Sequence, residues 1–151
     1  MEWSFATTGV GSVPNLRVEP TCRLILELFP EIPFWPQFVN LAPEEEMVLQ
    51  FSEGLPGIRT GEDGRSLQIS SESLEEELTR FYEAFLEGDV ETFAVSPERA
   101  RGLYALLELI GEAPAGDGLI KGQSVGPITF ASPVALEDGR QLLHDEDLLD
   151  A

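Results

Sequence analysis

Two glycine-containing stretches decide how this sequence is interpreted, Gly9-Val10-Gly11-Ser12-Val13-Pro14 and Lys121-Gly122-Gln123-Ser124-Val125-Gly126-Pro127-Ile128-Thr129. Each follows a short apolar run and is typical of a strand end that enters a tight loop. Glycine lacks a β-carbon, so such loops let backbone amides approach a ligand. Two of them in one α/β chain predict a shared binding site, although a single such loop is more often a simple turn. Neither has the spacing of a phosphate or dinucleotide loop.

The composition is that of a globular chain with a large excess of acidic residues. Of its 151 residues 42% are apolar, and the formal net charge is −19. This length fits one domain, which we expect to cover residues 1–151. An acidic surface repels phosphate backbones and anionic lipids, so we expect no nucleic-acid or membrane partner.

Cysteine and histidine each occur once, as Cys22 and His144. A single cysteine excludes an internal disulfide framework and suits the cytoplasm, where thiols stay reduced. One cysteine and one histidine cannot build a zinc site of the usual kind within one chain. We therefore predict no metal ligand and no catalytic residue here.

Strand and helix patterns alternate along the chain. The expected strands are 5–8, 34–39, 93–95 and 119–120, and the expected helices are 20–29, 44–51, 73–88, 97–110 and 138–151. Asp63-Gly64 predicts a hairpin between Ile58 and Ile69. The helix 73–88 is the most secure, because a capping box begins at Ser73 and apolar residues follow at helical spacing.

This alternation favours parallel strands joined by right-handed crossovers. A complete (β/α)8 barrel needs about 250 residues. We therefore predict an α/β fold that is a partial (β/α)8 TIM barrel, with about four βα units and a β-hairpin excursion. Open sheet edges in such a fold predict self-association, most simply as a homodimer.

At this point the motifs point to a family. The stretch from Phe5 to Pro14 resembles the opening strand and loop of the cobalamin-independent methionine synthase catalytic barrel. Residues 121–129 are similar to a later Gly-Pro-Ile/Val-Thr loop of that superfamily, which is related to uroporphyrinogen decarboxylase. Residues 31–37 and 50–57 resemble a short branch known as methionine synthase II. The resemblance covers nearly the whole chain but only the N-terminal half of the family's barrel.

The resemblance implies methyl transfer to a thiol such as homocysteine. It implies that Gly11 and Ser12 contact the thiol substrate, and we add Lys121, Gly126 and Thr129 from the second loop as predicted substrate-binding residues. The family's zinc ligands, cysteines and a histidine, follow the Gly-Pro-Ile-Thr loop and have no counterpart here. Zinc is therefore implied only for a longer member, and we expect the isolated chain to be inactive.

Three alternatives stay open. Relatives that bind homocysteine carry an acidic residue where this chain has Leu49, so the substrate could be another thiol or a corrinoid-linked group. A non-catalytic module that binds itself or a partner is the second alternative. Decarboxylation of a macrocycle ranks last, because Arg17 is the only basic residue near the first strand. For Lys121 we expect pairing with a carboxylate ahead of anion binding.

Overall fold

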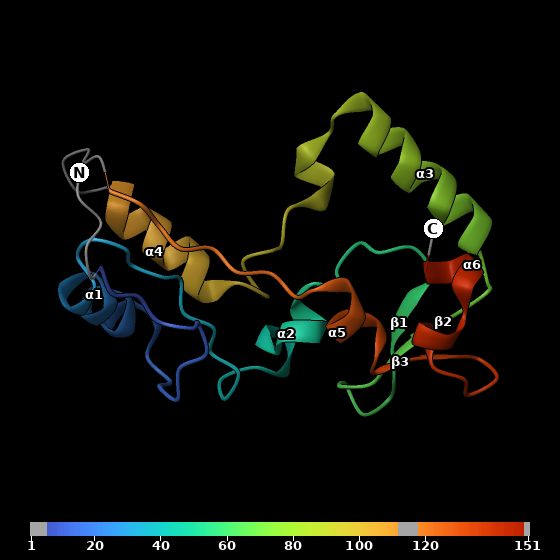
Figure 1. The fold of residues 1–151 in the computed structure, drawn as a ribbon, viewed down its shortest axis with the longest axis horizontal. Coiled ribbons are helices and arrows are strands. Elements are labelled where there is room, and N and C mark those ends of the chain that lie inside the picture. Colours follow the sequence, from blue (N-terminus) through green and yellow to red (C-terminus); the bar gives the residue numbers. More distant parts are fainter. Residues whose placement is uncertain (1–5, 112–117, 150–151) are drawn as a thin grey trace. The chain divides into compact units, whose positions relative to one another are not determined.

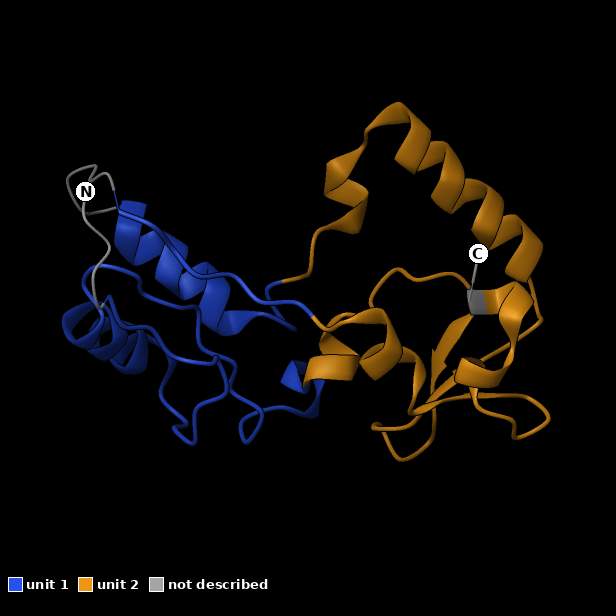
Figure 2. Cartoon of the chain, viewed as in Figure 1, with its two compact units in different colours: residues 1–46, 97–124 blue, residues 47–96, 125–151 orange. Residues whose placement is uncertain are grey.

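The computed structural model describes residues 6–111 and 118–149, and the chain divides into two compact units (Figure 2). Unit 1 comprises residues 1–46 and 97–124, and unit 2 comprises residues 47–96 and 125–151. Each unit is therefore assembled from two stretches that are distant in the sequence. Each also has its own set of buried residues, so we describe the two separately.

Unit 1 is built on two helices that pack against each other, α1 (Val18–Leu28) and α4 (Arg101–Gly111) (Figure 1). The 3-10 helix η1 (Pro43–Glu45) also belongs to it. Helix α1 has Pro20 in its first turn, where no amide donor is required, and Pro30 follows its end. The buried apolar residues of this unit include Cys22, Ile25, Phe34, Trp35, Phe38, Ala42, Ala100 and Leu106.

Unit 2 contains a three-stranded sheet in the order β1 (Ile58–Thr60), β2 (Leu67–Ile69), β3 (Val134–Leu136) (Figure 1). Strands β1 and β2 are antiparallel, whereas β2 and β3 are parallel. The helices of this unit are α2 (Met47–Gln50), α3 (Leu74–Glu87), η2 (Val90–Phe93), α5 (Pro127–Ala131), η3 (Leu142–His144) and α6 (Glu146–Leu149). One sheet face packs on a core of Leu49, Leu67, Ile69, Ala131, Val134, Leu136 and Leu142.

Two local predictions are confirmed. The hairpin turns at Asp63-Gly64 and pairs β1 with β2, and the Asp63 carboxylate accepts hydrogen bonds from the amides of Arg65 and Ser66. The helix predicted for 73–88 is α3, which ends at Gly88 in the left-handed conformation that favours glycine. The capping box is not formed, since Ser73 makes no side-chain cap hydrogen bond.

The predicted partial (β/α)8 barrel of about four βα units is wrong. The described residues form a small open sheet and six α-helices instead. Phe93 ends the 3-10 helix η2, where the Thr92 hydroxyl donates to Asp89 and favours a turn. Residues 6–8 and 119–120 form no strand, and Phe5 lies outside the described residues.

Proline explains why the segment 34–39 is not a full strand. It takes part only in isolated bridges, because Pro33 and Pro36 supply no amide donor to a ladder. Other predicted helices also differ from the structure. The helix 44–51 is divided into η1 and α2, α4 begins at Arg101, and the C-terminal helix is divided into η3 and α6. None of the helices in the described ranges combines the length and apolar character needed to cross a membrane.

Candidate functional site

Three segments of unit 1 meet side by side, and we call this place the loop junction: residues 10–13, 34–37 and 121–123. Ser12 forms a parallel bridge with Gln37, and Phe34 forms a parallel bridge with Lys121. The amide of Gln37 donates to the carbonyl of Gly11 at 3.0 Å, and the amide of Lys121 donates to Pro33 at 2.8 Å. The structure thus brings the first glycine-containing stretch beside the start of the second, residues 121–123.

Glycine is required at position 11 of the loop junction. Gly11 is buried with φ at +142°, a conformation that side chains rarely adopt. A β-carbon there would lie 2.6 Å from Nε2 of Gln123. This glycine therefore lets the first loop approach Gln123 of the second loop, while the neighbouring Ser12 stays exposed.

Lys121 ties the two loops together through its side chain. Its ammonium group donates to the carbonyl oxygen of Val10 at 2.9 Å and to Oε1 of Gln123 at 3.4 Å. Gln123 in turn donates to the carbonyl of Trp35 at 2.9 Å. Among the described residues, Lys121 therefore bonds to a backbone carbonyl and a side-chain amide in place of the carboxylate that we expected. An ammonium group has three donors, so one of them can still face a ligand.

The five predicted substrate-binding residues do not form one group. Gly11, Ser12 and Lys121 belong to the loop junction in unit 1. Gly126 and Thr129 belong to unit 2, where Gly126 precedes α5 and Thr129 is an exposed residue within that helix. The stretch 121–129 does not continue as a loop, because Pro127 starts the helix α5.

Neither Cys22 nor His144 fits the zinc chemistry that the resemblance implies. Cys22 is fully buried in α1, its thiol donates to the carbonyl of Gly102 at 3.6 Å, and burial raises its pKa to about 11. A metal-binding cysteine needs a lowered pKa instead. His144 lies in the other unit. Within residues 6–111 and 118–149, no group of three or more histidine, cysteine or acidic side chains could hold a metal ion.

A buried ion pair fixes the extended segment of unit 1. The side chain of Glu45 is fully buried, accepts a hydrogen bond from the amide of Phe38 at 2.8 Å, and pairs with Arg101 at 3.2 Å. Glu45 stands in the acidic run Glu44-Glu45-Glu46, and its two neighbours in this run are exposed. Its burial shows that this carboxylate connects three parts of unit 1: η1, the segment around Phe38 and the start of α4.

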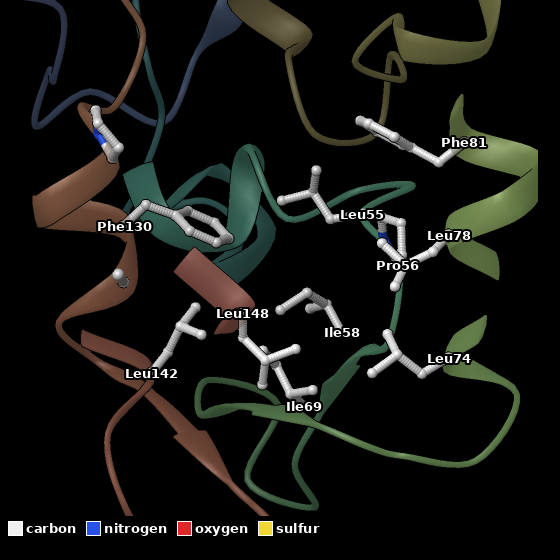
Figure 3. A pocket seen from close by; sticks show the side chains of 12 residues that line it. Leu55, Pro56, Ile58, Ile69, Leu74, Leu78, Phe81, Phe130, Leu142 and Leu148 are labelled. Atoms are coloured by element: carbon white, nitrogen blue, oxygen red, sulfur yellow. The ribbon is translucent and has the colours of Figure 1, made fainter. Parts of the chain in front are cut away.

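Unit 2 has an apolar groove that the sequence did not reveal (Figure 3). Leu74, Leu78 and Phe81 of α3 form one wall, and Figure 3 shows Phe130, Leu142 and Leu148 across from them. The space between the walls has a volume of about 270 Å³. The apolar residues of α3 recur at helical spacing, yet none of the residues of this helix is buried.

Two contacts hold α3 in place beside this groove. Glu77 accepts hydrogen bonds from Arg59 and from the amide of Gly57, and these bonds lower its pKa. Further along α3, the rings of Phe81 and Phe93 meet edge to face at 5.1 Å. The helix is thus attached in its first turn and near its middle, and Leu74, Leu78 and Phe81 are only partly buried.

Acidic residues border one end of the groove. A second depression shares Ile69, Leu74 and Leu148 with it, and is lined in addition by Ser71, Leu136, Glu137, Asp138, Arg140 and Asp145. Hydrogen bonds from Ser71 and Ser70 lower the pKa of Glu137, and hydrogen bonds from Arg140 lower that of Asp138. Asp138 and Asp145 both pair with the guanidinium group of Arg140 at this end.

Comparison of the chain with family models, curated proteins and solved structures finds no match.

Proposed function

We propose that this chain provides the thiol-substrate site of a methyltransferase, as its resemblance to cobalamin-independent methionine synthase implies. The observation that supports this proposal is the loop junction. The two stretches that carry the resemblance are 111 positions apart at Val10 and Lys121, yet a hydrogen bond joins them there. A ligand at Gly11 and Ser12 would meet both loops at once.

The chemistry of the loop junction suits an amino-acid substrate. Homocysteine carries a carboxylate, and an ammonium group beside backbone amides is a suitable partner for a carboxylate. Lys121 would supply this charge, and the exposed Ser12 would supply a hydroxyl group. Leu49 is buried in the core of unit 2, so the proposal assigns no substrate contact to that position.

The proposal is limited to substrate binding. Zinc would supply an activated thiolate in the family, but Cys22 and His144 do not fit a zinc site. We therefore expect no methyl transfer by the purified chain alone. We also place the protein in the cytoplasm as part of this proposal, because its single cysteine is a free buried thiol.

Titration with homocysteine tests the proposal directly. Shifts in the amide NMR signals of residues 10–13 and 121–123 are expected, and Lys121→Met should weaken binding about tenfold if the ammonium group meets the carboxylate. Arg23→Met is the control, because Arg23 is an exposed cation of unit 1 on α1. Equal binding by wild type and Lys121→Met, or methyl transfer by the isolated chain, would contradict the proposal.

A second candidate function is a non-catalytic binding module, and a specific observation favours it. Large apolar side chains are exposed in the described residues, among them Phe85 at 66% and Leu86 at 82% exposure on α3. The sheet of unit 2 also has β1 and β3 as its edges. Exposed apolar surface and open edges are typical of association with a partner or with a second copy. Sedimentation over a range of concentrations would show whether the chain forms a dimer.

A further inference from the structure

We propose that the apolar groove of unit 2 binds a basic amphipathic helix of a partner protein. This inference deepens the second candidate function and does not depend on methyl transfer. It rests on the apolar walls of the groove, on the way α3 is held, and on the charge of the surface around it.

The walls of the groove are arranged like those of a helix-binding groove. Leu74, Leu78 and Phe81 recur at helical spacing on one side of α3, so they form a ridge of roughly 10 Å along its axis. Phe130 and Leu142 lie across from this ridge (Figure 3). Two walls of this kind fit the apolar side of a helix with anchors at i, i+3 or i+4, and i+7.

The charge around the groove selects a basic occupant. Glu137, Asp138 and Asp145 line the depression that continues from the groove, and Arg140 is already paired with two of them. On α3, Glu75 and Glu76 are exposed in the first turn, and Glu76 also pairs with Arg80 of the same helix at 3.7 Å. Lysine or arginine side chains that flank an apolar helix face would meet these carboxylates, which favours association at low salt.

A second copy of the chain is the less favourable occupant. Each copy has a formal net charge of −19, so two copies repel each other. The exposed helix α3 is itself acidic, with Glu75, Glu76, Glu83 and Glu87 among its residues, and would place like charges at the rim. Charge complementarity therefore points to a partner of opposite charge.

A synthetic helical peptide tests the inference. The probe has leucine at the i, i+3, i+4 and i+7 positions and lysine or arginine elsewhere, and the matched control peptide has glutamate in place of every basic residue. Fluorescence anisotropy of the labelled peptides measures the Kd for the full chain. We expect the basic peptide to bind at least about tenfold more tightly than the acidic one at low salt, and high salt to reduce this preference.

Two variants on the same helix locate the binding surface. Leu78→Glu places a charge in the groove wall and should raise the Kd at least about tenfold, because burial of one leucine is lost. Leu86→Glu changes a leucine of α3 that does not line the groove, and should change the Kd by less than about twofold. If Leu78→Glu does not fold, the binding surface is located by NMR of the wild-type protein titrated with the basic peptide. The amide signals that shift should then cluster at Phe130, Leu142 and Leu148.

Several results would overturn the inference. Equal binding of the basic and acidic peptides would show that charge does not determine which peptide binds. Unchanged peptide binding by Leu78→Glu would show that the groove is not the binding site. A dimer that Leu78→Glu dissociates would show that a second copy occupies the groove, which overturns this inference but keeps the second candidate function. A further contrary result is that the wild-type chain binds a neutral apolar dye but not the peptide, and that Leu78→Glu no longer binds the dye. This result would show that the groove binds a small apolar ligand instead.

Discussion

The ammonium group of Lys121 donates a hydrogen bond of 2.9 Å to the carbonyl oxygen of Val10, 111 positions earlier in the chain. The backbone of Lys121 also forms a parallel bridge with Phe34. One residue therefore joins all three segments of the loop junction. Because these segments share few ladder hydrogen bonds, the side-chain bond contributes to holding them together.

Removal of this bond should loosen unit 1. Lys121→Met keeps an apolar stem of similar length but no donor, and we expect it to lower the free energy of unfolding by about 1 kcal/mol. Urea unfolding followed by circular dichroism measures the change. Arg23→Met, which breaks an exposed ion pair with Glu19 on α1, should change stability by less than about 0.5 kcal/mol. Equal effects of the two variants would contradict the role given to Lys121.

Glu45 should be far more important for stability than its neighbour Glu44. Glu45→Ala leaves the amide of Phe38 and the guanidinium of Arg101 without their shared acceptor, so we expect a loss of about 3 kcal/mol. Glu44 is exposed, and Glu44→Ala should cost less than about 0.5 kcal/mol. The midpoints of urea unfolding are compared for the two variants. Similar midpoints would show that the buried ion pair does not contribute to the stability of the protein.

Two glycines of α4 should respond in opposite ways to alanine. A β-carbon on Gly102 would lie 1.8 Å from the carbonyl oxygen of Pro36, so Gly102→Ala should destabilise the protein by about 2 kcal/mol or more. No atom of the described residues lies within 4 Å of a β-carbon on Gly111, and alanine is the better helix former, so Gly111→Ala should stabilise by up to about 1 kcal/mol. Thermal unfolding of both variants tests the opposite signs. Destabilisation by Gly111→Ala or tolerance of Gly102→Ala would contradict this packing.

The hairpin turn should give a pH-dependent contribution to stability. Hydrogen bonds from the amides of Ser66 and Arg65 and from the Ser66 hydroxyl lower the pKa of Asp63 to about 2, from an ordinary value of 3.8. The unfolded chain therefore binds more protons between these values. The contribution of Asp63 is fully present above about pH 4 and is lost as the pH falls towards about 2.

NMR titration of the Asp63 carboxyl group measures this pKa. In addition, Asp63→Asn should lose less stability than wild type as the pH falls from about 4 to about 2, since it has no carboxylate to protonate. Glu62→Gln changes the adjacent exposed carboxylate and serves as the control. A titration of Asp63 near its ordinary value would contradict the hydrogen bonding of this turn.

Local features were predicted well where they depended on neighbouring residues. The Asp63-Gly64 turn and the end of α3 at Gly88 follow from the conformations that glycine and aspartate adopt at short range. The strands were predicted poorly because their partners are distant. Val134–Leu136 forms β3 by pairing with β2, and its short apolar pattern alone gave no indication of that pairing.

Of the two candidate sites, one was predicted in part from the sequence and the other was missed. The two glycine-containing stretches were expected to meet, and the loop junction brings Gly11 and Lys121 into one unit, although Gly126 and Thr129 belong to the other. The apolar groove was missed because Leu74, Leu78 and Phe81 have the spacing of a core face. Periodicity indicates which side of a helix is apolar, but not what covers that side.

The sequence by itself determined the acidic charge, the hairpin turn, the limits of α3 and the presence of a single cysteine and a single histidine. Only the tertiary structure decided which segments pair, that Glu45 is buried, and that the apolar face of α3 lines an open groove. The physical reason is the distance along the chain over which each kind of interaction acts. Turn chemistry and helix periodicity act over a few residues, whereas strand pairing and burial depend on contacts between residues far apart in the chain.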